Sequence, residues 1–335
     1  MATYEEAFEK YGIAVPPPEL FYSKEYISYF STFAPEVVDP ELEKYRQFQE
    51  MYIVAQYITF TKPFQANPYQ VNSSSREAVV LGGQAGAGKT ALSILAIKEF
   101  EQRRKNIYLI DDDLYRALYP RRGDLLQEFP EHFTKISAIG SSNITPRILD
   151  FAVSNGLNFI FDGTMKNPRI LRTSEGWRDY TINWKIMATS RLESLISVAE
   201  RNQVLKREKT SRLITVDTHN EMFDGLQSTV EELESLPNPG RIQVYTRGES
   251  LLKPNLIYDS QGKSNIYSSP SEALRAGRVI SRQETLSRGI GRRLDAIRND
   301  ENLSQEELVI IEEIDRYARK YIIEHPGVPK GEQGE

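Results

Sequence analysis

Eight consecutive residues in the first third of the chain constrain its fold more than any other stretch. They follow the phosphate-loop (Walker A) pattern G-x-x-x-x-G-K-[ST] in full and read Gly83, Gln84, Ala85, Gly86, Ala87, Gly88, Lys89 and Thr90. An apolar run at 78–81 precedes them and an apolar-periodic segment at 92–97 follows, which predicts a strand, a loop and a helix. Glycines let backbone N–H groups turn inward around phosphate oxygens, and the helix adds the positive end of its dipole. We therefore predict a nucleotide site in which Lys89 reaches the β- and γ-phosphates and Thr90 offers its hydroxyl to Mg²⁺; the alternative is a glycine-rich turn with an accidental lysine.

The pattern after residue 76 alternates between short apolar runs and helical periodicity. Strands are expected at 106–110, 157–161, 184–188, 241–246 and 255–259, and helices at 145–154 and 192–206. Such alternation is typical of a mainly parallel sheet flanked by helices. The sequence therefore predicts an α/β fold with a P-loop core over residues 76–262.

Helical sequence flanks this core on both sides. Asp39 and Pro40 have the N-cap and first-turn pattern of a helix within an N-terminal extension, residues 1–75. Capping boxes at 269–272 and 304–307 predict helices in a C-terminal region, residues 263–326, before a disordered tail at 327–335. The N-terminal helices have two interpretations, packing against the core or regulating it.

Carboxylates follow two of the expected strands, at the edge of an open α/β sheet where ligands bind. The strand expected at 106–110 is followed directly by Asp111, Asp112 and Asp113, and the strand expected at 157–161 is followed by Asp162 and Thr164. One member of the acidic trio would support Mg²⁺ and another would accept a proton from a substrate hydroxyl. The alternative is that these residues only form turns or cap the next helix.

Two arginines bracket a polar segment after the strand at 184–188. Arg201 lies in the expected helix and Arg212 ends the polar run REKTSR. A guanidinium is always charged and grips phosphate with two donors, so arginines here suit charge stabilisation in phosphoryl transfer. Taken singly, each is also compatible with an ordinary solvated surface residue.

Composition excludes several other kinds of site. The 335 residues include no cysteine, which excludes disulfides, zinc–thiolate sites and cysteine nucleophiles, and the three histidines are too scattered to indicate a metal cluster. The net charge of −5 argues against a general polyanion binder, so nucleic acid is not an expected partner. The sequence has no apolar run of about 18 residues and does not begin with a basic and then apolar leader. We therefore expect a cytoplasmic protein with no membrane partner. It would act in the cell that makes it or after delivery into a target cell.

With these residues in place, the middle of the chain resembles the zeta toxin family of bacterial kinases. The match runs over residues 77–260 in the order GGQAGAGKT, IDDD, FIFDGT, AERN and RLITVDTHN, followed by the paired late strands. The resemblance implies transfer of the γ-phosphate of ATP or GTP to the sugar 3′-hydroxyl of UDP-N-acetylglucosamine. It also implies an antitoxin whose helix blocks the nucleotide site, a task that residues 39–60 would perform in cis if the N-terminal extension is regulatory.

The resemblance also assigns roles to individual residues. Lys89 and Thr90 match the phosphate and magnesium positions, and Asp113 matches the catalytic base. Arg201 and Arg212 match the two arginines that hold the transferring phosphates. Thr164 matches a substrate-contacting threonine, and His219 matches a family histidine to which no role is assigned. Asp111 is included among the expected substrate contacts.

Three departures from the family pattern lie on the acceptor side. The glutamate before Gly-Thr is Asp162 here, one methylene shorter, and the arginine two positions after the threonine is Lys166. A further family glutamate falls near Pro146, with Asp150 as the nearest carboxylate. The sequence therefore leaves other acceptors open, among them NAD, which a plant-pathogen effector of this broad group phosphorylates.

Two other classes of function remain as alternatives. A partner-dependent ATPase switch would hydrolyse nucleotide without making a phosphorylated small molecule. A nucleic-acid 5′ kinase would need a basic groove, and the scattered basic residues do not single one out.

Overall fold

The structure is a computed structural model that describes residues 39–65, 76–119, 122–128, 130–207, 214–248, 253–262, 265–300 and 303–324. The chain forms two compact units. The first consists of residues up to Gln70 together with Asn106–Leu157, and the second of Val71–Lys105 together with Asn158–Glu335. The expected helices before residue 39 and the expected tail after residue 326 lie outside the described residues, and the predicted domain boundaries at 75/76 and 262/263 stay predictions.

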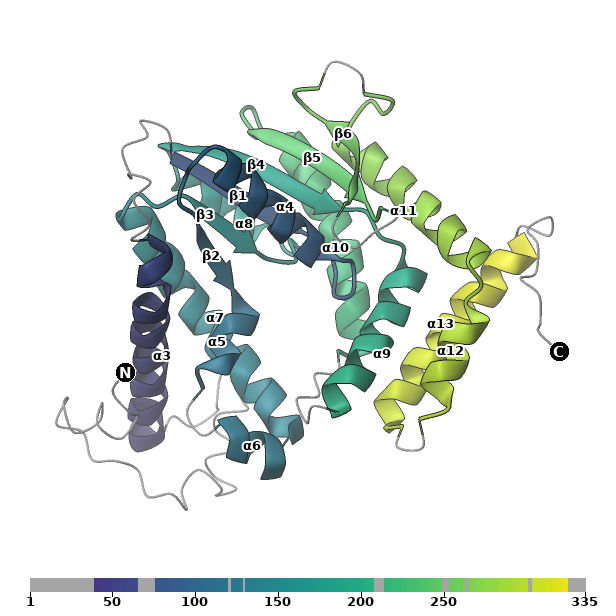
Figure 1. The fold of residues 1–335 in the computed structure, drawn as a ribbon, viewed down its shortest axis with the longest axis horizontal. Helices are drawn as coiled ribbons and strands as arrows, with labels where there is room; N and C mark the ends of the chain where they lie inside the picture. The colour runs from purple at the N-terminus through teal and green to yellow at the C-terminus, as the bar shows by residue number, and fades with distance from the viewer. Residues whose placement is uncertain are drawn as a thin grey trace. The chain divides into compact units, whose positions relative to one another are not determined.

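A mainly parallel sheet forms the centre of the second unit (Figure 1). Its strands lie in the order β3-β1-β4-β5-β6, of which the first four are parallel and β6 is antiparallel to β5. Their bounds are β1 Arg76–Gly82, β3 Phe159–Asp162, β4 Tyr180–Met187, β5 Arg241–Thr246 and β6 Asn255–Asp259. Strand β1 is buried from its second residue onward, because helices cover both faces of a parallel sheet. The predicted α/β fold with a mainly parallel sheet is therefore confirmed.

Seven helices of the second unit are described, and they pack on this sheet or on one another. Helix α4 contacts β1, β3 and β4, whereas α11 contacts β5 and β6 and lies beside α9 and α10 (Figure 1). Helices α12 and α13 pack on α9, where apolar side chains such as Leu195, Leu294 and Ile310 form a second core. The bounds are α4 Lys89–Gln102, α8 Arg169–Glu175, α9 Arg191–Arg207, α10 Val216–Glu234, α11 Pro270–Ser287, α12 Gly291–Arg298 and α13 Gln305–Glu324.

Both capping patterns predicted for the C-terminal region are present. The Ser269 hydroxyl accepts from the Glu272 N–H at 3.2 Å, and the Ser304 hydroxyl accepts from the Glu307 N–H at 3.3 Å. Glu307 completes the box by accepting from the Ser304 N–H at 2.7 Å. Because each cap satisfies N–H groups that a helix start leaves unpaired, α11 and α13 begin where the sequence predicts.

The first unit contains one described strand among helices. Its elements are α3 Pro40–Gln65, β2 Tyr108–Asp111, α5 Asp112–Ala117, α6 Arg122–Glu128 and α7 Pro130–Ser154. Asp39 caps α3 as predicted, accepting from the Leu42 N–H at 3.0 Å. Tyr57 of α3 is buried, donates to the Leu109 carbonyl of β2 and meets the Tyr115 ring edge-on at 4.7 Å. This face of α3 is therefore packed within its own unit.

The largest differences from the predicted element boundaries are at α7 and β4. The helix expected at 145–154 is the second half of α7, which begins at Pro130 and includes Pro146 within it. Strand β4 begins at Tyr180, four residues before the expected start, because the alternating polar residues of its first half hid the strand. The acidic trio is divided between the last residue of β2 and the first two residues of α5.

Candidate functional site

The phosphate loop joins β1 to α4, as the sequence predicts. Its backbone turns at Gly86 (φ 72°) and Gly88 (φ 98°), both in the left-handed region that only glycine adopts at low cost. A Cβ at Gly86 would lie 2.1 Å from the Ser194 carbonyl oxygen, so this position has no room for a side chain. The loop shape therefore depends on the glycines of the motif.

Lys89 and Thr90 are the first two residues of α4. The Lys89 ammonium donates to the Gly83 carbonyl at 3.0 Å, which holds the cation against the start of the loop. Thr90 is exposed, and the N-cap residue Gly88 brings no side chain to the N–H groups of the first turn. A helix start that no side chain caps, beside a cation, suits an anion, because the helix dipole and the cation both favour negative charge.

Side chains from the β4–α9 connection, from α9 and from α10 support the loop. The buried Gln84 amide donates to the Thr189 carbonyl at 2.8 Å and to the Ser194 hydroxyl at 3.1 Å. The Thr189 hydroxyl in turn donates to the Ala87 carbonyl at 2.7 Å, and Nε2 of the buried His219 lies 2.9 Å from the Ser194 hydroxyl. His219, to which the sequence assigned no role, is thus part of the support for the loop.

Burial of His219 predicts an acid-sensitive fold. Burial lowers the pKa of His219 to about 4 from its ordinary value of 6.5, so between these pH values the unfolded chain binds a proton that the folded chain does not. The free energy of unfolding therefore falls as the pH falls through this window, by about 2 kcal/mol between pH 7 and pH 5 from this group. Urea titrations at both pH values should show a correspondingly smaller decrease for His219→Gln; equal decreases in the variant and the wild type would contradict the prediction.

The polar residues after β3 lie beside the loop. Strand β3 pairs with β1 so that Asp162 is opposite Leu81, and the Thr164 carbonyl accepts from the Gly83 N–H at 3.3 Å. The Asp162 carboxylate accepts from the Ser93 hydroxyl of α4 at 3.1 Å. Lys166 is half-exposed, with its ammonium 3.8 Å from the Glu221 carboxylate. The structure therefore brings Asp162 and Thr164 next to the phosphate loop, and their contact with a substrate stays a prediction.

The remaining candidates divide between the two units or lie outside the described residues. Asp111 ends β2 and Asp113 is in α5, both in the first unit, and the side chain of Asp113 lies outside the described residues. Arg201 is exposed on α9 of the second unit, and Arg212 lies outside the described residues. Their approach to the phosphate loop remains a prediction.

Arg247 contacts the loop, and the sequence analysis did not select it. It follows β5 directly, and its guanidinium donates to the Gly86 carbonyl through Nη2 and to the Ala87 carbonyl through Nε at 3.1 Å. Burial lowers the pKa of Arg247. The sequence feature that could have indicated Arg247 is its position directly after a parallel strand, at the edge of the sheet where ligands bind.

Comparison with known proteins places this loop in a family. The model of the family described as "Zeta toxin" matches residues 63–271, more than half of the chain. The chain belongs to the zeta toxin family. Toxin PezT of Streptococcus pneumoniae is 26% identical over 189 residues, which make up 55% of this chain and 72% of PezT. Toxin zeta of Streptococcus agalactiae is 26% identical over 178 residues, which make up 52% of this chain and 61% of that toxin.

A solved structure from the same family shares the fold. The structure from the PezAT chromosomal toxin–antitoxin system of Streptococcus pneumoniae aligns with a TM-score of 0.56 and 20% identity, over 81% of this chain and 96% of that chain. This likeness supports the P-loop kinase-like fold of the zeta toxin family. None of the helices that the structure describes is both long enough and apolar enough to cross a membrane.

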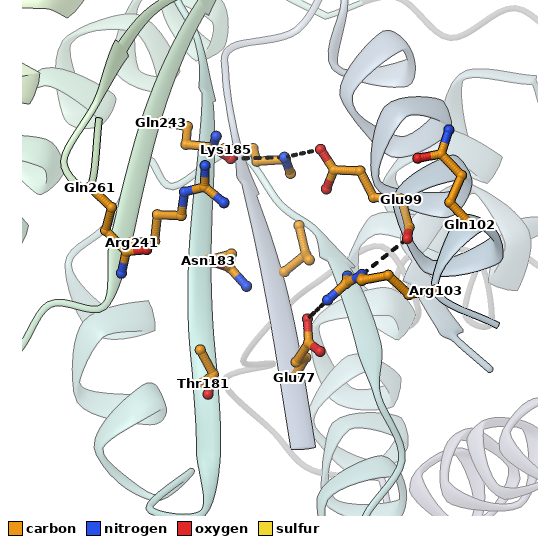
Figure 2. Close-up of a pocket in the computed structure, with 11 residues that line it drawn as sticks. Glu77, Glu99, Gln102, Arg103, Thr181, Asn183, Lys185, Arg241, Gln243 and Gln261 are labelled. Atoms are coloured by element: carbon orange, nitrogen blue, oxygen red, sulfur yellow. Dashed lines mark hydrogen bonds and ion pairs between the residues drawn. The ribbon is translucent and has the colours of Figure 1, made fainter. Parts of the chain in front are cut away.

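The zeta toxin fold here also has a polar cavity away from the phosphate loop. Its volume is about 450 Å³, and its walls are the early residues of β1, β4 and β5 and the last turn of α4, whereas the loop precedes the first turn of α4. Figure 2 shows side chains from the sheet and from α4 directed into it, among them Lys185, Arg241, Gln243, Glu99 and Arg103.

The cations of this cavity are already paired. Lys185 contacts Glu99 at 3.0 Å, Arg103 contacts Glu77, and Arg241 contacts Asp259. Burial lowers the pKa of Lys185, which the Glu99 carboxylate partly offsets. Because paired cations have little charge left for a phosphate, the phosphate loop is the better nucleotide site.

Proposed function

We propose that this chain is a Mg²⁺-dependent kinase that transfers the γ-phosphate of ATP or GTP to a hydroxyl of a small nucleotide-containing metabolite. The observation that carries the proposal is the loop: two left-handed glycines, followed by Lys89 and Thr90 at the start of α4, in a chain of the zeta toxin family. The first candidate for the acceptor is UDP-N-acetylglucosamine at its sugar 3′-hydroxyl, and the protein would then act as a toxin or effector.

The chemistry divides between proton transfer and charge stabilisation. The Asp113 carboxylate takes the proton of the acceptor hydroxyl, whose oxygen forms a bond to the γ-phosphorus while the bond to the β–γ bridging oxygen breaks and ADP or GDP leaves. Lys89, Arg201 and Arg212 hold the negative charge of the phosphoryl group during transfer.

The residues at the loop fit a magnesium ion. The Thr90 hydroxyl is exposed, and the Asp162 carboxylate is held near α4 by Ser93, so both oxygens are of the type that Mg²⁺ prefers. Thr90 would bind the ion directly and Asp162 through a bound water. When bound, Mg²⁺ would neutralise charge on the β- and γ-phosphates.

Observations at the three altered acceptor-side positions favour a second candidate acceptor, such as NAD. The shorter Asp162 carboxylate is engaged by Ser93, and the Lys166 ammonium is near Glu221. Pro146 and Asp150, where the family pattern has its further glutamate, are both exposed on α7. An acceptor site with three altered positions would fit a different sugar or nucleotide group.

An inhibitory partner is part of the proposal. The PezAT neighbour comes from a toxin–antitoxin system, which supports an antitoxin for this chain. The alternative, inhibition in cis by the N-terminal extension, receives less support because α3 already buries Tyr57 against β2 within its own unit.

Mass spectrometry of a metabolite extract tests the function directly. The protein, Mg²⁺ and ATP should produce a species heavier by one phosphoryl group, and Lys89→Ala should not produce it because the phosphates lose their cation. A product that matches UDP-N-acetylglucosamine would support the first acceptor, and one that matches NAD would replace it. ATP consumption without any phosphorylated metabolite would contradict the kinase and favour the partner-dependent ATPase switch.

A further inference from the structure

The carbonyl groups of the phosphate loop need donors of their own. When the N–H groups of such a loop turn inward to phosphate, its carbonyls point outward and must be satisfied elsewhere. At Gly86 and Ala87 this is done by Arg247, whose Nη2 and Nε donate to the two carbonyls, with Thr189 as a second donor to Ala87.

These contacts also set the direction of the loop N–H groups. Because the peptide unit is planar, fixing the Ala87 carbonyl fixes the Gly88 N–H. Fixing the Gly86 carbonyl likewise fixes the Ala87 N–H, which donates to the Gln84 carbonyl at 3.1 Å inside the loop. A Cβ added at Gly88 would lie 3.2 Å from the Arg247 Nε, so the guanidinium lies close against the loop. Arg247 therefore acts on the direction of the Gly88 N–H, which would meet a phosphate, and on the internal turn from Gln84 to Ala87 that shapes the loop.

Glu193 of α9 holds Arg247 in place. One carboxylate oxygen, Oε1, accepts from Arg247 Nη1, which also donates to the Ser197 hydroxyl at 3.1 Å. Burial alone would raise the pKa of Glu193, but hydrogen bonding from Arg293 and the charges of Arg247 and Arg293 lower it overall, so the carboxylate stays ionised. A buried charge pair of this kind is costly to disrupt, because removing one partner leaves the other unpaired.

The second oxygen of Glu193 connects to the C-terminal helices. Oε2 accepts from Arg293 Nη1 of α12 at 2.8 Å and from the Thr285 hydroxyl of α11 at 2.9 Å. Arg293 is itself fixed on Glu200 of α9 by two hydrogen bonds, at 2.6 and 2.7 Å. A continuous series of contacts thus runs from the loop carbonyls to α11 and α12.

We propose that Arg247, Glu193 and Arg293 form a brace that holds the phosphate loop in its nucleotide-binding shape and makes the C-terminal helices part of the nucleotide site. The three are positioning residues, since they act on phosphate through the loop backbone. The proposal rests on nucleotide binding, the first step of the proposed function, and does not depend on the acceptor. It gives a role to helices for which the sequence showed no functional signal.

The ATP affinity of the Arg293→Gln variant tests the brace at its residue on α12, which is the one farthest along the chain of contacts from the loop. Calorimetry without any acceptor should show about tenfold weaker ATP binding, the usual effect of losing one hydrogen bond between charged groups. At saturating ATP, the kcat should stay within about twofold of the wild type, because the loss concerns binding and not transfer. Arg298→Gln is the matched control: Arg298 is on the same helix and pairs with Asp315 instead of Glu193, so ATP affinity should not change.

Variants at Arg247, the brace residue that contacts the loop, separate an effect on the shape of the loop from an effect on the stability of the fold. Arg247→Lys keeps the charge but cannot reach both carbonyls as a guanidinium does, so it should lose affinity rather than rescue it. The double variant Arg247→Lys/Arg293→Gln should lose less than the sum of the single variants, because Arg293 acts on the loop only through Glu193 and Arg247. Lower melting temperatures with unchanged ATP affinity would overturn the brace and leave a structural role only.

The two proposals can fail separately. A chain that binds ATP with the expected variant pattern but makes no phosphorylated metabolite would support the brace and overturn the kinase. A wild-type chain that binds neither ATP nor GTP would overturn both.

Discussion

Replacing Asp113 with asparagine is expected to lower the rate of phosphoryl transfer about 10²- to 10⁴-fold, the contribution typical of a positioned general base. Asparagine has nearly the same shape as aspartate but cannot accept the proton of the acceptor hydroxyl. The loss should appear in kcat while ATP affinity stays unchanged, since the phosphate loop is built from other residues. Single-turnover transfer with saturating ATP and the identified acceptor measures this directly.

A matched control is available in the second unit. Asp179→Asn makes the same chemical change at an exposed carboxylate that precedes β4, where the side chain is 81% exposed and 3.7 Å from Arg76. This variant should transfer phosphate at the wild-type rate. If Asp113→Asn were as active as Asp179→Asn, the base would be wrongly assigned, and Asp111 at the end of β2 would be the next residue to test.

Local signals account for what the sequence predicted well. The phosphate loop is defined by neighbouring residues, and its glycines, its lysine and the start of α4 are where the motif puts them. The caps at Asp39, Ser269 and Ser304 depend on side chains within three residues of the helix start, so they too could be read from the sequence. The position of Asp162 beside β1 follows from parallel pairing, which the alternation of strands and helices implies.

Contacts between distant residues account for what the sequence did not reveal. Arg247 is 160 residues from Ala87, and Arg293 is 100 residues from Glu193. Neither arginine belongs to a motif, and the charge of an arginine alone does not indicate whether it is buried against a backbone carbonyl. The support that His219 gives to Ser194 is of the same kind, because it becomes visible only when α9 and α10 are packed together.

The nucleotide side and the acceptor side of the proposed reaction therefore differ in the observations that support them. The nucleotide side has a motif, a family and a geometry that agree. The acceptor side has Asp162 and Thr164 next to the loop, together with altered residues at three family positions. The proposed kinase chemistry is therefore compatible with an acceptor other than UDP-N-acetylglucosamine.

Substitution of Arg201 by alanine is expected to reduce kcat about 10³- to 10⁵-fold, as for other arginines that stabilise charge on a transferring phosphoryl group. Arg201 is exposed on α9, whereas Leu195 and Val198 of the same helix are buried in the core with α12 and α13, so the helix should remain folded without the guanidinium. Arg201→Lys should recover little activity, because an ammonium lacks the two parallel donors that match phosphate oxygens.

The control for Arg201 is Arg178→Ala, which removes an exposed arginine before β4 and should leave transfer unchanged. Melting temperatures of both variants should lie close to that of the wild type, since exposed substitutions of this kind have small effects on stability. If Arg201→Ala transferred phosphate within about threefold of the Arg178→Ala rate, charge stabilisation would have to come from Lys89 and Arg212 alone. In the expected outcome Arg201→Ala loses transfer but still binds ATP, because Arg247, Glu193 and Arg293 keep the loop in place; nucleotide binding and phosphoryl transfer would then depend on separate sets of arginines.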